Sequence, residues 1–180
     1  MVSTVRSRLP RRLRRRRCRM GDTWYLDDVF VMIQGRQQCL CRAVDEDGDM
    51  IDILVQSRRK RRAAVRFALK LLKRQGCVPR RLITDELGSF SAARRTVIPS
   101  VVHSPRQYEN NRVEVSHQPT RQCGRQMRRF KSVAHLQRFE AVHGLVLNLF
   151  RVGRHLLRSA HYRLRRTRAF VEWDAVTCAC

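Results

Sequence analysis

The hydrophobic positions of this chain first follow the pattern of β-strands. Three runs rich in β-branched, aromatic and other apolar residues come early, at 24–33 (WYLDDVFVMI), 37–45 (QQCLCRAVD) and 50–57 (MIDILVQS). Runs of this length and composition are typical of strands. An acidic segment, EDGD at 46–49, separates the second run from the third. Asp-Gly between two apolar runs predicts a tight hairpin there.

A helical period then replaces the strand pattern. Across residues 58–76, apolar side chains recur every three or four positions, Lys and Arg fill the other face, and Gly76 marks the end. After Gly76, short strands alternate with helices. Pro119 is expected to kink or end the helix that begins at Asn110 or Asn111. The predicted elements are a strand at 80–84, a helix at 88–97, a strand at 100–104, the helix containing Pro119 and a long helix at 131–158.

This order of elements predicts an α/β fold. Leading strands joined by short turns, followed by strands that alternate with helices, indicate a mixed five-stranded sheet flanked by helices. Residues 1–22 show no hydrophobic period and are expected to form a basic tail. We therefore expect one folded core at 23–177, which includes the helix at 131–158, and a short tail at 178–180.

Charge narrows the choice of partner. The 180 residues include 39 Lys and Arg against 15 Asp and Glu, a formal net charge of +24. Such a field favours a polyanion, above all nucleic acid, and Arg binds phosphate through a planar fork. An anionic membrane surface is the second choice. No apolar run approaches the ~20 residues that a membrane-spanning helix needs.

Cysteine use argues against a secreted disulfide framework. The chain has seven Cys, an odd number, and no secretory signal precedes them. Cys39 and Cys41 are expected on one face of a strand, and Cys178 and Cys180 lie at the end of the sequence. Neither pair has further Cys or His at zinc-ribbon spacing, so we favour reduced or buried thiols over a zinc site.

Three acids stand at positions where a fold of this kind brings side chains together. Asp27 lies within the first strand, Asp85 follows the strand at 80–84, and Glu114 lies in the first turn of a helix. Carboxylates from such elements can converge at one edge of a sheet and supply the oxygen ligands that Mg²⁺ prefers. Two ions held there can clamp the attacking and leaving oxygens of a phosphoryl displacement.

Each acid also has a purely structural interpretation. Asp27 can face solvent on an edge strand, Asp85 can cap the next helix, and Glu114 can complete a capping box that begins at Asn111. Strand alternation places Asp28 on the face opposite Asp27, near the surface or beside a basic partner. The residues alone therefore leave catalytic and structural roles open.

Several longer motifs occur in a recognisable order. They are WYLDD at 24–28, RAVDEDGD at 42–49, ITDELGSF at 83–90, ENNRVEVSHQPTR at 109–121 and RQMRRFKS at 125–132. Through these motifs the chain resembles the DDE transposases of bacterial insertion sequences, specifically the IS-six group. The resemblance extends over essentially the whole chain and implies an RNase H-like, retroviral-integrase-like catalytic core.

The resemblance implies specific roles for the three acids. Asp27, Asp85 and Glu114 are the expected catalytic residues and ligands of two Mg²⁺ ions, which Mn²⁺ can replace. The implied activity is nicking of the ends of an insertion sequence, followed by attack of the freed 3′-hydroxyl on target DNA. The expected partners are element ends, target DNA and further copies of the chain, in the bacterial cytoplasm at the nucleoid, without a membrane.

Basic residues near the third acid are expected to contact DNA. His117 could act as a general acid or base, but a phosphate contact or a place next to the metal ligands is preferred. The full set of expected DNA-binding residues is Arg112, His117, Arg121, Arg125, Arg128, Arg129, Lys131 and the arm residues Arg14, Arg15, Arg16 and Arg17.

The chain also departs from the family pattern. The family usually has Glu where this chain has Asp28, and Lys and Tyr where it has Glu86 and Phe90. Glu86 places an anion beside the expected site. Only 26 residues precede Asp27, where the family carries a helix-turn-helix, so we expect a truncated protein whose residues 1–22 are the remnant of a linker. The alternative functions are a non-catalytic basic DNA-binding protein and a stand-alone RNase H-like nuclease.

Overall fold

The computed structural model describes residues 13, 21–57, 60–84, 88–104, 111–126, 129–151 and 157–177. The chain divides into two compact units. One unit is Met20–Glu140, and the other combines Met1–Arg19 with Ala141–Cys180. The strands and the candidate site belong to the first unit.

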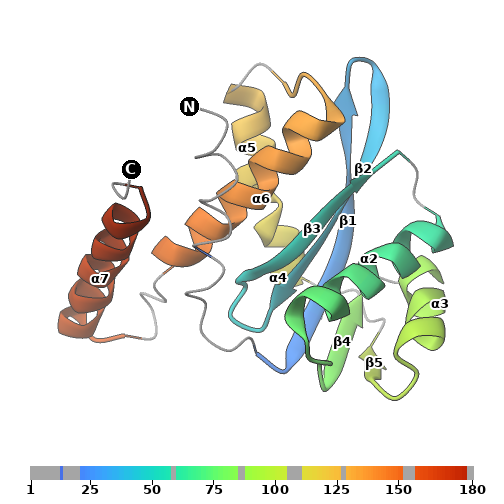
Figure 1. Cartoon of the computed structure of the whole chain (residues 1–180), viewed down its shortest axis with the longest axis horizontal. Coiled ribbons are helices and arrows are strands. Elements are labelled where there is room, and N and C mark those ends of the chain that lie inside the picture. The colour runs from blue at the N-terminus through green and yellow to red at the C-terminus, as the bar shows by residue number, and fades with distance from the viewer. Residues whose placement is uncertain are drawn as a thin grey trace. The chain divides into compact units, whose positions relative to one another are not determined.

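A mixed five-stranded sheet forms the centre of this unit (Figure 1). Its strands are β1 (Thr23–Ile33), β2 (Arg36–Asp45), β3 (Met50–Gln56), β4 (Arg81–Thr84) and β5 (Val102–Ser104). In space their order is β3-β2-β1-β4-β5. The pairs β1–β2 and β2–β3 are antiparallel, whereas β1–β4 and β4–β5 are parallel. The predicted mixed α/β sheet is confirmed, and long β1 lies at its centre.

Two tight turns set the register of the antiparallel half. Gln34 and Gly35 join β1 to β2 with φ of 50° and 73°. Two consecutive positive φ values match the right-handed twist of a hairpin. The predicted hairpin between β2 and β3 is also present: Gly48 has φ of 80°, and Asp45 Oδ1 accepts hydrogen bonds from the backbone N–H groups of Asp47 and Asp49.

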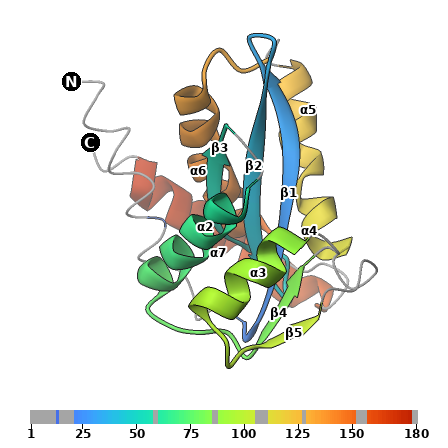
Figure 2. The ribbon, with the colours of Figure 1, turned by 90° about the vertical axis from the view of Figure 1, so that its right-hand side faces the viewer.

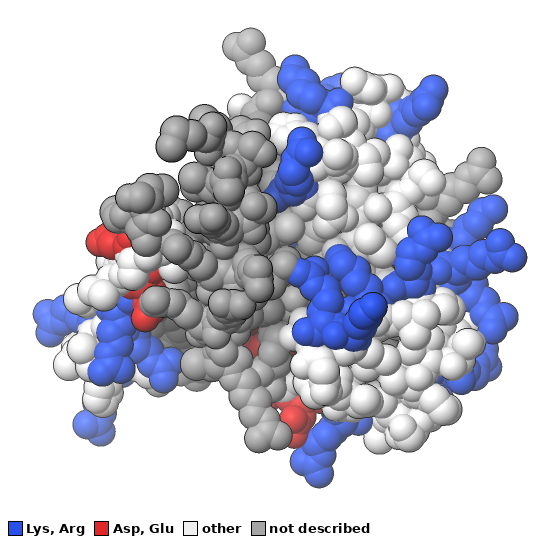
Figure 3. Space-filling view, in the orientation of Figure 1, with Lys and Arg blue, Asp and Glu red and all other residues white. Residues whose placement is uncertain are grey.

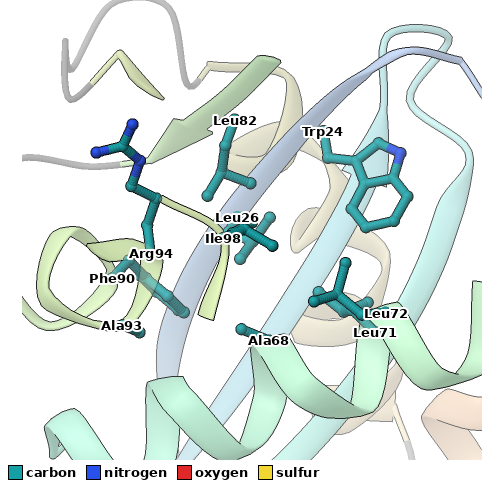
Figure 4. A pocket seen from close by; sticks show the side chains of 10 residues that line it. All are labelled: Trp24, Leu26, Ala68, Leu71, Leu72, Leu82, Phe90, Ala93, Arg94 and Ile98. Atoms are coloured by element: carbon teal, nitrogen blue, oxygen red, sulfur yellow. The ribbon is translucent and has the colours of Figure 1, made fainter. Parts of the chain in front are cut away.

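Helices α2 (Arg61–Gln75) and α3 (Gly88–Val97) pack on one face of the sheet (Figure 2). Gly76 ends α2 in the left-handed conformation, with φ of 67°. The apolar side of α2 meets the even-numbered positions of β1, Trp24 and Leu26. Figure 4 shows this packing, in which side chains from β1, β4 and both helices surround a gap of only about 10 Å³.

The other face of the sheet carries α4 (Asn111–Ser116), α5 (Gln118–Gln126) and the first part of α6 (Val133–Phe150). The expected single helix is interrupted at His117, and Pro119 lies in the first turn of α5. Proline fits that position because its missing N–H has no partner in the first turn. The interruption places His117 between two helices rather than within one.

The second unit contains the end of α6 and a further helix, α7 (Ser159–Thr177). The sequence predicted a helix over 131–158, whereas α6 ends at Phe150. Phe150 contacts Phe170 and Trp173 of α7, with ring centroids 5.1 and 6.1 Å apart. None of the helices in the described part of the chain combines the length and the hydropathy needed to cross a membrane.

Candidate active site

Asp27 lies near the middle of β1, on the face that α4, α5 and α6 cover. It is opposite Arg42 in the β1–β2 register. Its side chain is 14% exposed, and its Oδ2 lies 3.3 Å from Nε2 of His117. A carboxylate on a central strand that still reaches solvent can bind an ion and a substrate together.

β4, which ends one residue before Asp85, and α4, which contains Glu114, both adjoin β1. The last residue of β4, Thr84, is opposite Leu26 in the parallel register, and Asp85 is the next residue in the sequence, outside the described residues. Glu114 belongs to α4, which packs against β1 and β2. Its side chain is not described, but the neighbouring Val113 is fully buried.

His117 is almost completely buried, with 1% of its surface exposed. That burial does not fit the predicted contact with DNA and favours the alternative place next to the metal ligands. Burial lowers the pKa of His117 below its usual value, and the nearby Arg42 lowers it further, while contact with Asp27 raises it. The net direction is downward, so the imidazole is neutral at pH 7 and has one N–H to offer.

A buried polar cluster connects β2 to α4, α5 and α6 on the same face of the sheet as Asp27. The Arg42 guanidinium donates to the backbone carbonyl of Ser116 and to the carboxylate of Glu140, and its Nη2 donates to Thr120 Oγ1 over 2.6 Å. The Thr120 hydroxyl in turn donates to Glu140 Oε2 over 3.0 Å. Burial raises the pKa of Glu140, while the Arg42 charge and these hydrogen bonds lower it.

The sequence itself gives no sign of this cluster. Arg42 and Glu140 are 3% and 0% exposed, and 98 positions separate them in the chain. A single basic residue in a chain with 39 Lys and Arg gives no signal that it is buried. Through Arg42, which lies opposite Asp27, the cluster connects the strand next to Asp27 with α4, α5 and α6.

A basic groove lies beside the site. It has a volume of about 840 Å³, between the second half of β1 and α5. Arg121, Arg125 and Arg129 line it together with Phe130, and these three arginines and Lys131 are exposed. Lys and Arg also predominate over Asp and Glu on the face shown in Figure 3. The groove offers phosphate-binding cations within one cavity.

Several predicted residues lie outside this description. Arg14, Arg15, Arg16, Arg17, Arg128 and Glu86 are not among the described residues, and the side chain of Arg112 in α4 is not described. Phe90, where the family usually has Tyr, is 2% exposed and belongs to the apolar core under α3. A buried Tyr hydroxyl needs a hydrogen-bond partner, so Phe suits this core.

Asp28 points away from Asp27, as strand alternation predicts. It is half-buried, and its Oδ2 lies 3.5 Å from Sγ of Cys39 on β2. The two adjacent carboxylates therefore serve opposite faces of the sheet, and only Asp27 belongs to the candidate active site.

The fold is that of retroviral integrase cores. A chain of the simian T-cell lymphotropic virus intasome, solved in complex with PP2A regulatory subunit B56 gamma, matches 90% of this chain and 56% of its own length, with a TM-score of 0.56 and 14% identity. The HTLV-2 integrase catalytic core, solved in complex with magnesium, matches 76% of this chain and 92% of its own, with a TM-score of 0.51 and 14% identity. The predicted RNase H-like fold is confirmed.

Comparison of sequences gives the family. The transposase of the insertion sequence-like element IS431mec from Staphylococcus aureus (strain Mu50 / ATCC 700699) is 31% identical over 99 residues, 52% of this chain and 44% of the relative. The transposase of IS257 in transposon Tn4003, also from Staphylococcus aureus, matches equally well. The chain thus spans less than half the length of these relatives. Residues 21–153 match the DDE domain family, well over half of the chain, so the protein belongs to the DDE domain family, as the resemblance implied.

Proposed function

We propose that this chain is the catalytic core of an insertion-sequence transposase, which nicks DNA and joins the freed 3′-hydroxyl to a target strand. One observation carries the proposal. Asp27, the first acid of the motif, lies on the central strand, where β1 pairs with the end of β4 and packs against the helix that bears Glu114. The segments that carry the first and third acids are therefore neighbours, and the second acid follows β4 by one residue in the sequence.

The donor set suits a hard divalent cation. Asp27, Asp85 and Glu114 offer carboxylate oxygens only, the ligands that Mg²⁺ binds, and we propose them as its ligands. The 14% exposure of Asp27 leaves a path for water and a phosphate. When bound, two Mg²⁺ ions would activate the attacking hydroxyl and stabilise the leaving oxygen, and Mn²⁺ would serve in their place.

The chain's own residues would hold this site in shape. Neutral His117 lies against Oδ2 of Asp27 and limits the orientations that the carboxylate can take, leaving its other oxygen for a ligand. Arg42 sits opposite Asp27 and binds α4 through the Ser116 carbonyl. That bond fixes the distance between β2 and the helix that carries Glu114. Both residues thus position metal ligands and do not themselves touch the substrate.

The basic groove would bind the sugar–phosphate backbone of DNA. Arg121 and Arg125 are exposed, four positions apart on α5, so both point to the groove that they line. Phosphate contacts of this type position the duplex without reading its sequence. Arg129 and Lys131 extend the same basic surface, and Arg112 and Arg128 complete the proposed set with the arm at residues 14–17.

Substituting Arg121→Ala and Arg125→Ala together should flatten the salt dependence of DNA binding. Each lost phosphate contact removes roughly 0.9 from the slope of log K against log salt concentration, so the double variant should lose about 2. Fluorescence anisotropy of a labelled duplex over a salt series measures the slope. A matched control is Arg62→Ala with Arg66→Ala, two exposed arginines at the same spacing on α2. An equal change of slope in the control variant would mean that the groove is not a specific DNA-binding surface.

We also propose self-association on DNA. Two element ends must be joined to one target, and one catalytic site acts on one strand at a time, so two copies of the core are needed in one complex. The place of action would be the bacterial cytoplasm, where the DNA of the nucleoid lies.

Nicking of supercoiled plasmid tests the function directly. The purified chain should convert supercoiled to open-circular DNA with Mg²⁺ or Mn²⁺ and should stop when EDTA is added. A labelled 3′-end joined to a target plasmid would identify strand transfer. Metal-dependent nicking without joining would favour a stand-alone nuclease instead. DNA binding with no cleavage under either metal would leave a non-catalytic DNA-binding protein and overturn the proposal.

A further inference from the structure

Behind the candidate active site, on the opposite face of the sheet, two thiols and a carboxylate lie together. Asp28 on β1 is opposite Cys41 in the strand register, and Cys39 is two residues earlier on β2. Cys39 and Cys41 therefore share a face with Asp28. The third donor, Asp28, is therefore evident from the pairing of the two strands and not from the spacing of the cysteines in the sequence.

The distances between these donor atoms suit one tetrahedral ion. Cys39 Sγ lies 4.0 Å from Cys41 Sγ and 3.5 Å from Asp28 Oδ2, and all three donor atoms lie within 4.8 Å of one another. A tetrahedral Zn²⁺ with bonds of about 2.3 Å to sulfur and about 2.0 Å to oxygen separates its ligands by about 3.8 Å (S to S) and about 3.5 Å (S to O). Two of the three separations already match these values.

The surroundings also favour a soft cation over a hard one. Cys39 and Cys41 are 1% and 2% exposed and belong to the apolar core, and Asp28 is half-buried. Thiolate ligands select zinc and other soft cations over Mg²⁺. In the described ranges this is the one cluster of three metal-binding side chains of this kind.

We propose that Asp28, Cys39 and Cys41 form a second, soft-metal site that binds Zn²⁺ or a cation of similar chemistry, with water as the fourth ligand. Binding would form two metal–sulfur bonds and release both thiol protons to solvent, with no change of oxidation state. The ion would join β1 to β2 directly behind Asp27 and Arg42. It would differ from the proposed catalytic ions in having two sulfur donors where those have carboxylate oxygens only, and in the face of the sheet that holds it.

Cobalt is the probe that separates the two sites. The full chain, reduced with a phosphine, stripped with EDTA and then freed of chelator, is titrated with Co²⁺. We expect thiolate-to-cobalt charge-transfer absorption that saturates at one equivalent and disappears when Zn²⁺ is added. Carboxylate sites give no such band. Cys39→Ala and Cys41→Ala should each abolish it, and Asp28→Asn should weaken Co²⁺ binding roughly tenfold or more.

Three controls test the assignment. Cys77→Ala changes an exposed thiol, Cys178→Ala with Cys180→Ala removes the other C-x-C pair of the sequence, and Asp27→Asn changes the candidate active site. Each should keep the band. Circular dichroism in EDTA checks that the core variants fold, and Asp28→Asn tests the site at a half-buried position if they do not. No charge-transfer band at one equivalent, a band that survives both core Cys substitutions, or full affinity in Asp28→Asn would overturn the proposal.

Discussion

Asp27→Asn is expected to reduce Mg²⁺-dependent nicking of DNA by about 10³-fold, because it removes one negative charge from the proposed metal ligands while it keeps the side-chain volume. Loss of a single well-placed electrostatic group in an active site typically lowers the rate by roughly 10²–10³-fold. A residue that would hold the catalytic metal should lie at the upper end of that range. The measurement is the initial rate of conversion of supercoiled to open-circular plasmid at saturating metal.

The matched control is Asp22→Asn, which makes the same chemical change five positions earlier. The Asp22 side chain is 60% exposed and lies 4.0 Å from the still more exposed Arg80, so its loss should leave the nicking rate unchanged. Binding of Mn²⁺, followed by calorimetry without DNA, should weaken in Asp27→Asn and persist in Asp22→Asn. Wild-type nicking by Asp27→Asn, or an equal loss in both variants, would show that Asp27 is not a metal ligand.

The antiparallel half of the sheet could be predicted because its signals are local. The apolar runs and the Asp-Gly turn lie within 35 consecutive residues, 23–57, and each strand pairs with the next one in the chain. The apolar stripe of α2 is equally local: Phe67, Ala68 and Leu71 are buried as its period predicts. Hydrophobic periodicity and turn residues act over a few positions, so both can be recognised in a single sequence.

The residues that surround Asp27 and Asp28 could not be predicted in this way. For His117 the sequence left a phosphate contact and a place beside the expected metal ligands both open, since its burial between α4 and α5 is a tertiary feature. Arg42 looked like one of many surface cations, because Glu140 is 98 positions away. The proximity of Asp28 to Cys39 and Cys41 depends on the strand register. The sequence predicts that these strands pair, but it does not determine which residues lie opposite one another. Long-range pairing decides all three cases.

Removal of the Glu140 carboxylate should destabilise the protein more than any other single change discussed for this cluster. Glu140→Ala removes the carboxylate that pairs with the guanidinium of Arg42, which is 3% exposed, and breaking a buried ion pair from one side costs about 3–5 kcal/mol. The free energy of unfolding, from urea titration followed by circular dichroism, measures the loss. Asp22→Ala, which breaks the exposed contact with Arg80, should cost under ~1 kcal/mol.

Two further variants separate charge from hydrogen bonding in the same cluster. Glu140→Gln should cost less than Glu140→Ala, because the amide oxygen still accepts from Arg42 and because burial, which raises the pKa of Glu140, disfavours the charged form. Arg42→Met with Glu140→Leu should recover much of the stability, since no charge then stays buried. Yet that stable double variant should still nick DNA slowly, because α4 has lost its bond from Arg42 to the Ser116 carbonyl. Full activity in it would mean that Arg42 stabilises the fold without positioning the site.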